Sequence, residues 1–371
     1  MQNRIELNSP RQNEVKMRDA LIWASLMGLP VMLCACVLSA SGAEACDGEY
    51  VGGMGNWSSS ASWKNGAKAA GAGAILTVRA EEKNAAGYFL SLDEDATVGH
   101  IVRPADCEQP EGLSSKFSFS SFFLRTATVG STCALTLDSG IAGQPATIRH
   151  PVPRAKMNGK RFPLVFENRF VLRSDLEVSY EGVFDRICGN GWISGSLGAF
   201  PHYTVALLGD ISEADGSHAV TLENPVYAKN GSGVADTFNP VLMTGNNTFT
   251  GDLTVRQGGL RVALNGAAAA EGSRISHALG RNNAIHVDNA GLGYLDLGGL
   301  IAGVDGNTLY LGGMGPRTAM GTLINMNPDP LAVGEWRGPL VIASETRLGG
   351  VTEAANGAAG GGNLKLSGAV R

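Results

Sequence analysis

The amino-acid sequence predicts an all-β chain: a right-handed parallel β-helix (β-solenoid) with irregular rungs and loop insertions, preceded by a signal peptide. Short segments in which apolar and polar residues alternate recur along the chain, separated by turn residues. Glycine is abundant, at 51 of 371 residues, and only 17% of residues are charged. This composition suits many tight turns between short strands and does not suit a helical bundle.

Residues 1–45 are predicted to be a secretory signal peptide. Residues 20–40 form an apolar run without a charged side chain, and basic residues precede it. The segment Ala43-Glu44-Ala45 fits an A-x-A cleavage site, so we expect cleavage before Cys46. An exported protein is the consequence, placed at the cell surface or outer membrane or in the medium.

The leader leaves three questions open. The apolar run is long enough, at roughly 20 residues, to span a bilayer as an uncleaved anchor. The segment Leu33-Cys34-Ala35-Cys36 resembles a lipobox, which would make Cys36 a lipidated residue. Translation could begin at Met1 or at Met17. A periplasmic or lipid-anchored protein is therefore the alternative location.

Cysteine content also fits an exported chain. The chain has six cysteines, and Cys34 and Cys36 would leave with the leader. The remaining residues are Cys46, Cys107, Cys133 and Cys188. An even number in an exported protein predicts two disulfides with three alternative connectivities. Because no Cys-x-x-Cys spacing occurs, neither a zinc ribbon nor a redox pair is expected.

Residues 46–105 are predicted to be an N-terminal capping β module. Trp57 and Trp63 lie six residues apart among small residues, and a strand is expected at 74–78. The open end of a solenoid exposes apolar side chains and unpaired backbone groups, which large aromatic side chains can cover. The alternative is a carbohydrate-binding module, in which Trp57, Trp63 or Trp192 would stack on a sugar.

Residues 106–240 are predicted to be an irregular solenoid region with insertions, and residues 241–371 a β-strand repeat region. The clearest repeat is 247–262, where Phe249, Leu253 and Val255 alternate with smaller residues before a glycine turn. The other strand-like segments are 90–93, 97–102, 134–138, 146–149, 163–166, 176–180, 203–207, 285–297, 308–313 and 363–368. Because the chain stops at Arg371 inside such a segment, more protein is expected to follow.

Several of these segments share their order and spacing with a known family. Residues 247–262 read Asn-Thr-Phe-Thr-Gly, a Thr-Val strand, a glycine turn and a Leu-rich strand, and 295–299 read Leu-Asp-Leu-Gly-Gly. These segments resemble the autotransporter-associated β-strand repeat of bacterial surface proteins. The Trp pair resembles the family's opening module, although Ser62 stands where Asn is usual. The resemblance implies a surface passenger that a C-terminal barrel or sorting signal, not seen in this chain, would attach to the cell.

Motifs for chemistry are weak. Asp93, Glu94 and Asp95 could bind calcium, but a solvated turn is the simpler interpretation because no calcium-loop spacing surrounds them. His286 and Asp288 share one face of a strand without a nucleophile. We therefore predict no catalytic, cofactor-binding or metal-binding residue and no cofactor.

A carbohydrate-active β-helix, either a polysaccharide lyase or a glycosidase, is the second hypothesis. Such an enzyme needs carboxylates clustered on neighbouring rungs. The densest acidic group comprises Asp175, Glu177, Glu181 and Asp185. Convergence of such carboxylates in one groove would favour this hypothesis over a scaffold.

The first functional hypothesis is a secreted or surface-displayed structural or adhesive passenger without catalysis. Possible partners are host or environmental glycans or other surface proteins. The net charge of −5 and the absence of a basic stripe exclude a nucleic-acid-binding surface. Contact with an outer membrane is expected only through a C-terminal segment beyond this chain.

Overall fold

A computed structural model of the chain shows its fold. Contacts divide the chain into two units, Met1–Gly42 and Ala43–Arg371, and the description below concerns the second. The structure describes residues 44–79, 88–104, 122–127, 131–151, 164–181, 205–223, 240–264, 269, 271–287, 293–315, 321–327, 331–350 and 363–371. The predicted leader, apart from its last two residues, lies outside these residues.

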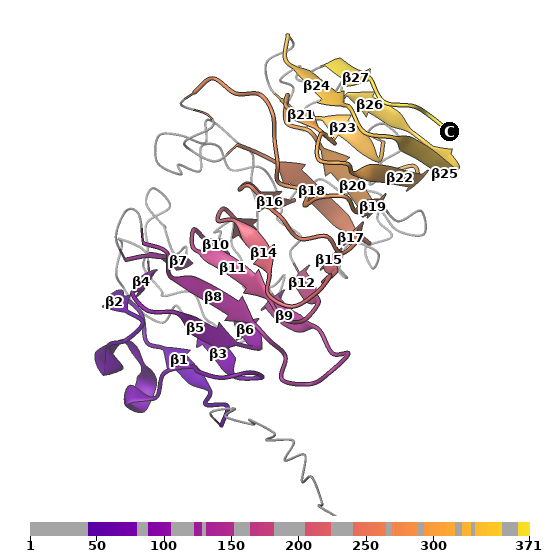
Figure 1. The fold of residues 1–371 in the computed structure, drawn as a ribbon. Coiled ribbons are helices and arrows are strands. Elements are labelled where there is room, and N and C mark those ends of the chain that lie inside the picture. The colour runs from indigo at the N-terminus through magenta and orange to yellow at the C-terminus, as the bar shows by residue number, and fades with distance from the viewer. Residues whose placement is uncertain are drawn as a thin grey trace, which may run out of the picture. The chain divides into compact units, whose positions relative to one another are not determined.

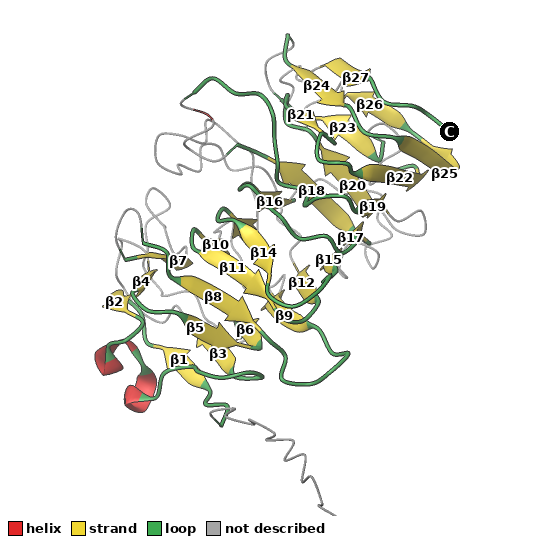
Figure 2. Ribbon diagram, viewed as in Figure 1, coloured by secondary structure: helices red, strands yellow, loops and turns green. Residues whose placement is uncertain are grey.

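Two ten-stranded parallel sheets make up most of the second unit (Figures 1 and 2). Sheet 1 contains, in order of pairing, β1 (Gly48–Tyr50), β3 (Ile75–Val78), β6 (His100–Val102), β9 (Ala146–Pro151), β12 (Leu176–Glu181), β15 (Val220–Glu223), β17 (Leu253–Val255), β19 (Ala284–Val287), β22 (Thr308–Gly313) and β25 (Leu340–Thr346). Sheet 2 contains β2 (Met54–Asn56), β4 (Tyr88–Leu92), β7 (Phe122–Thr126), β10 (Leu164–Phe166), β13 (Val205–Leu207), β16 (Val241–Met243), β18 (Gly258–Val262), β20 (Gly293–Asp296), β23 (Leu323–Asn325) and β26 (Leu348–Gly350).

Two smaller sheets complete the rungs. Sheet 3 contains β14 (Ile211–Glu213), β11 (Arg169–Leu172), β8 (Ala134–Leu137) and β5 (Ala96–Val98). Sheet 4 contains β21 (Ile301–Ala302), β24 (Val333–Trp336) and β27 (Asn363–Leu366). Every strand pair is parallel, and the chain visits the sheets in turn before it returns one position further along each. This arrangement confirms the predicted parallel β-solenoid.

Strand alternation produces a narrow core inside the rungs. One side of sheet 1 presents a column of aliphatic side chains in register, each no more than 3% exposed. The column consists of Leu76, Ile101, Ile148, Val178, Leu222, Val255, Val287 and Leu311. Burial of each such side chain contributes about 1.5–3 kcal/mol to the free energy of unfolding, so many contributions of similar size stabilise the stack.

The outer face of sheet 2 is also buried over part of its length. Val165, Ala206 and Leu242 lie on neighbouring strands and form a second apolar cluster outside the main core. Further along the same face Arg261 and Asp296 are paired in register and form a 3.3 Å ion pair, with both side chains 1% exposed. Since burying one charge alone is expensive, each of these two side chains requires the other.

The N-terminal edge of sheet 1 is covered by the chain itself. Antiparallel bridges join Cys46 to Ala70 and Tyr50 to Trp63 along the free edge of β1. The intervening segment includes two short 3-10 helices, η1 (Ser60–Ser62) and η2 (Lys64–Gly66), which Figure 2 shows in red beside β1 and β2. The first rung is therefore protected from pairing with another chain.

The Trp pair belongs to this cover and is buried. Trp57 is 1% exposed and Trp63 is 3% exposed, and their rings meet edge to face with centroids 5.0 Å apart. The indole Nε1 of Trp63 donates to the Trp57 carbonyl oxygen at 2.8 Å. Neither ring has an open face for a sugar, so stacking on Trp57 or Trp63 does not fit this structure. Trp192 lies outside the described residues.

Most predicted strands are present, with one correction. Each predicted segment contains a strand, but 97–102 is two strands and not one. The break is at Gly99, where the backbone leaves sheet 3 and enters sheet 1. A Cβ at Gly99 would lie 2.6 Å from the Gly73 Cα, which explains why a glycine occupies this corner.

No disulfide is present among the described residues. Cys46 and Cys133 are both free, the first exposed and the second half-buried, which argues against the predicted pairings. Cys107 and Cys188 lie outside the described residues. Within the described part of the chain, none of the helices has the length and apolar character needed to cross a membrane.

Candidate functional site

Aspartates that precede strands join one rung to the next. In each case a side-chain oxygen accepts a backbone N–H from the following rung. The pairs are Asp47 with Ile75 (2.8 Å), Asp95 with Ala134 (2.9 Å), Asp175 with Ala219 (2.9 Å), Asp210 with Asn246 (2.7 Å) and Asp252 with Ala284 (3.3 Å). These carboxylates satisfy donors at strand starts, so their recurrence has a structural cause.

The carboxylates of the acidic turn at 93–95 also contact other segments of the chain. Asp93 accepts from the backbone N–H of Ser58 at 2.9 Å and from its hydroxyl at 2.6 Å. Burial raises the pKa of Asp93, but the hydrogen bonds from Ser58 outweigh this effect and leave the pKa below its ordinary value. Glu94 pairs with Lys68, so the three carboxylates contact three different partners. The described residues contain no cluster of three or more His, Cys, Asp or Glu side chains that could hold a metal ion.

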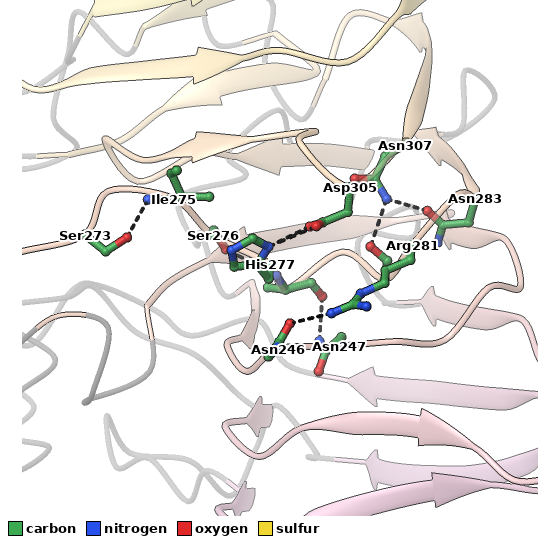
Figure 3. Close-up of polar contacts among 12 residues, drawn as sticks. Asn246, Asn247, Ser273, Ile275, Ser276, His277, Arg281, Asn283, Asp305 and Asn307 are labelled. Atoms are coloured by element: carbon green, nitrogen blue, oxygen red, sulfur yellow. Dashed lines mark hydrogen bonds and ion pairs between the residues drawn. The ribbon is translucent and has the colours of Figure 1, made fainter. Parts of the chain in front are cut away.

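Three buried asparagines form a second set of rung joints, shown in Figure 3. The Asn247 amide donates to the carbonyls of Thr244 and Ala278 at 3.1 and 2.6 Å. Asn307 donates to the side-chain oxygen of Asn283 at 2.7 Å. All three asparagines are at most 5% exposed. Their side-chain nitrogens donate to neighbouring oxygens, and all three side chains lie buried between rungs.

Two polar pairs lie over these asparagines, nearer to solvent (Figure 3). The imidazole Nδ1 of His277 lies 2.9 Å from Asp305, and the Arg281 guanidinium donates to the Asn246 side chain at 3.2 Å. Each pair joins residues on different rungs, and the polar atoms of the two side chains contact each other. We therefore interpret this corner as a structural joint.

His286 occupies the outer face of sheet 1, as predicted. Its ring stacks on Tyr310 with centroids 4.8 Å apart, and its Nε2 lies 3.7 Å from Asp252. Asp288, which was predicted to share this face, lies outside the described residues. The two rings cover each other, which limits their open faces.

A hollow of about 430 Å³ lies where sheet 3 passes into sheet 1. Three consecutive rungs supply most of its lining, through the turns after β8, after β11 and before β15, and Ala72 before β3 adds one residue. Its polar lining residues are Asp138, Gln144, Arg173, Ser174, Asp175 and His218. This is the place where charged side chains from several rungs approach one another.

Hydrogen bonds between neighbouring rungs and within single turns fix the walls of the hollow. The hydroxyls of Ser139 and Ser174 lie 3.1 Å apart, and Asp138 accepts the Gly140 backbone N–H at 2.9 Å. On the far wall, the imidazole Nε2 of His218 lies 3.1 Å from Asp215. These contacts hold the turns in one arrangement. A ligand that binds there would therefore cost little conformational entropy of the protein.

The second His218 nitrogen faces Asp175, one of the two carboxylates that line the hollow. Its Nδ1 lies 3.8 Å from the Asp175 carboxylate, and the imidazole side chain is 16% exposed. The backbone N–H of His218 donates to Glu213 at 2.6 Å, which anchors the turn. His218 is thus placed by carboxylates on three sides.

The sequence identified one residue of the hollow and missed the others. Asp175 belonged to the predicted acidic group. Glu177 lies on β12 and does not line the hollow. The Glu181 side chain and Asp185 lie outside the described residues. Asp138, Gln144, Arg173 and His218 were not predicted. They come from three rungs and share no local motif, so only the register of the strands brings them together.

Comparison with known proteins identified no relative. No family description, curated protein or solved structure matches the chain.

Proposed function

We propose that the chain is an exported, non-catalytic β-solenoid scaffold that is displayed at a bacterial surface as a structural or adhesive passenger. The observation that carries the proposal is the continuous stack of parallel rungs, in which sheets 1 and 2 each run through ten strands. Such a stack forms a stiff support because every rung bonds to its neighbours.

The use of polar residues supports the scaffold function. Buried asparagines and the aspartates before strands are engaged in contacts between rungs, as Asn247 and Asp175 illustrate. These polar residues thus serve the stack. The leader predicted from residues 1–45 and the resemblance to the autotransporter-associated repeat supply the exported location.

Export can be tested on the full chain. We would fuse residues 1–371 to an alkaline phosphatase without its own leader, express the fusion in a Gram-negative bacterium, and measure phosphatase activity in intact cells. A matched variant carries Leu26→Arg and Leu29→Arg, which interrupt the apolar run. Active wild-type fusion and inactive variant are expected; an inactive wild-type fusion that accumulates in the cytoplasm would contradict the proposal.

The mass of the exported product separates the remaining alternatives. Cleavage after Ala45 leaves Cys46 as the first residue, whereas lipidation leaves a modified Cys36. An uncleaved anchor retains the whole leader. Intact-mass measurement of the purified protein distinguishes these three products.

A further inference from the structure

We propose that the hollow formed by Asp138, Gln144, Arg173 and Asp175 is a binding site for a neutral, hydroxyl-rich glycan. This inference deepens the proposed adhesive function, on which it rests, by assigning a ligand class to one face of the solenoid. Its volume of about 430 Å³ lies within the range of small-molecule sites.

Polar groups around the hollow remain available for a ligand. Within the described part of the chain, the Arg173 guanidinium and the Gln144 amide make no side-chain hydrogen bond or ion pair. Asp138 and Asp175 each use Oδ1 for a backbone N–H, at 2.9 Å in both cases. Their Oδ2 atoms accept no hydrogen bond from the described residues. Donors and acceptors are therefore both present.

The mixture of charges indicates the kind of ligand. The two carboxylates repel a polyanion. The guanidinium repels a simple cation. A sugar hydroxyl both donates and accepts, so adjacent hydroxyls can bond to a carboxylate and a guanidinium at once. A neutral glycan uses all these groups without introducing a charge.

The dimensions also suit a glycan. Neighbouring rungs lie about 4.8 Å apart, so lining residues on three rungs extend over roughly 10 Å. That span accommodates a short oligosaccharide laid across the rungs. The turn from Gly140 to Gly143 borders the hollow with exposed residues, among them Ile141 at 64% exposure, so the hollow is open to solvent there.

The test measures binding to an array that carries neutral oligosaccharides, built from glucose, galactose, mannose and N-acetylglucosamine, beside anionic polysaccharides. The affinity for the best-bound glycan is then measured by calorimetry for wild type, Arg173→Gln and Ala142→Trp. Ala142 is exposed and lines the hollow, so the Trp side chain blocks it without removing a polar group. Arg149→Gln is the matched control, because Arg149 is an exposed arginine on β9.

We expect Arg173→Gln and Ala142→Trp each to weaken binding about ten-fold or more, as loss of a charged hydrogen bond predicts. Arg149→Gln should bind as wild type does. The inference is overturned if no neutral glycan binds, if only anionic polysaccharides bind, or if both hollow variants keep wild-type affinity. Because circular dichroism monitors folding and the phosphatase fusion reports export, a failed glycan test leaves the scaffold proposal separately measurable.

Discussion

Gly251 offers a sharp test of how closely the rungs pack. An added Cβ at this residue would lie 2.1 Å from both the carbonyl carbon and oxygen of His218 on the preceding rung. These are backbone atoms that cannot rotate away, so Gly251→Ala must separate the two rungs locally. The neighbouring bonds from Ala219 to Asp175 and from Val220 to the Asp252 carbonyl, at 2.9 and 2.8 Å, would lengthen.

The magnitude follows from opposing effects. Overpacking costs about 1–3 kcal/mol, and weakening the adjacent hydrogen bonds adds about 1 kcal/mol. Alanine also restricts the unfolded chain, which restores about 0.4–1 kcal/mol. We therefore expect Gly251→Ala to lower the free energy of unfolding by about 2 kcal/mol.

Urea unfolding followed by far-UV circular dichroism measures this change, with Thr254→Ala on the outer face of β17 as the control. Hydrogen exchange at the Ala219 and Val220 amides reports the local opening. Faster exchange at these two amides should accompany the loss of stability. Unchanged or increased stability of Gly251→Ala would refute the argument, because only the unfolded-state effect would then remain.

Three further predictions concern individual polar contacts in the stack and in its N-terminal cover. Asp95→Ala should destabilise the protein by about 1 kcal/mol, because it removes the acceptor for the Ala134 N–H of the next rung. Glu94→Ala removes an exposed ion pair and should change stability by less than about 0.5 kcal/mol. Hydrogen bonds from Arg337, Ser367 and Lys365 together lower the pKa of Glu335 to about 2, below the ordinary 4.5. The carboxylate therefore stabilises the fold above pH 4.5, and the advantage of wild type over Glu335→Gln should disappear as the pH falls toward 2. Trp63→Phe should cost about 1–3 kcal/mol, since it leaves a buried carbonyl without its donor.

Each of these predictions has a contrary result. Equal stability losses in Asp95→Ala and Glu94→Ala would show that the acceptor before the strand has no special role. A constant difference between wild type and Glu335→Gln across the acid range would contradict the lowered pKa. Wild-type urea stability of Trp63→Phe would show that the indole bond is dispensable.

Local patterns in the sequence predicted most strands. Phe249, Leu253 and Val255 alternate in the sequence, and all three are buried in the structure. Leu253 and Val255 belong to the short strand β17, and Phe249 is buried in the loop that precedes it. The corner at Gly99 was missed since six residues of suitable composition can form either one strand or two.

The hollow could not be predicted in the same way. Asp175 and His218 are 43 positions apart in the numbering, and Asp138 and Arg173 come from two further turns. No spacing rule connects such residues until the register between rungs is known. The expected disulfides of Cys46 and Cys133 are absent for a related reason, because cysteine number does not determine which side chains meet.

The sequence by itself determined the class of the fold, because alternation and glycine-rich turns act within a few residues. It also determined the export hypothesis, which rests on a contiguous apolar run. Tertiary structure alone decided that the Trp pair is buried, that Asp175 joins two rungs, and that Arg173 faces a hollow with it. These properties depend on contacts between successive rungs, whose spacing along the chain varies with the length of every intervening loop.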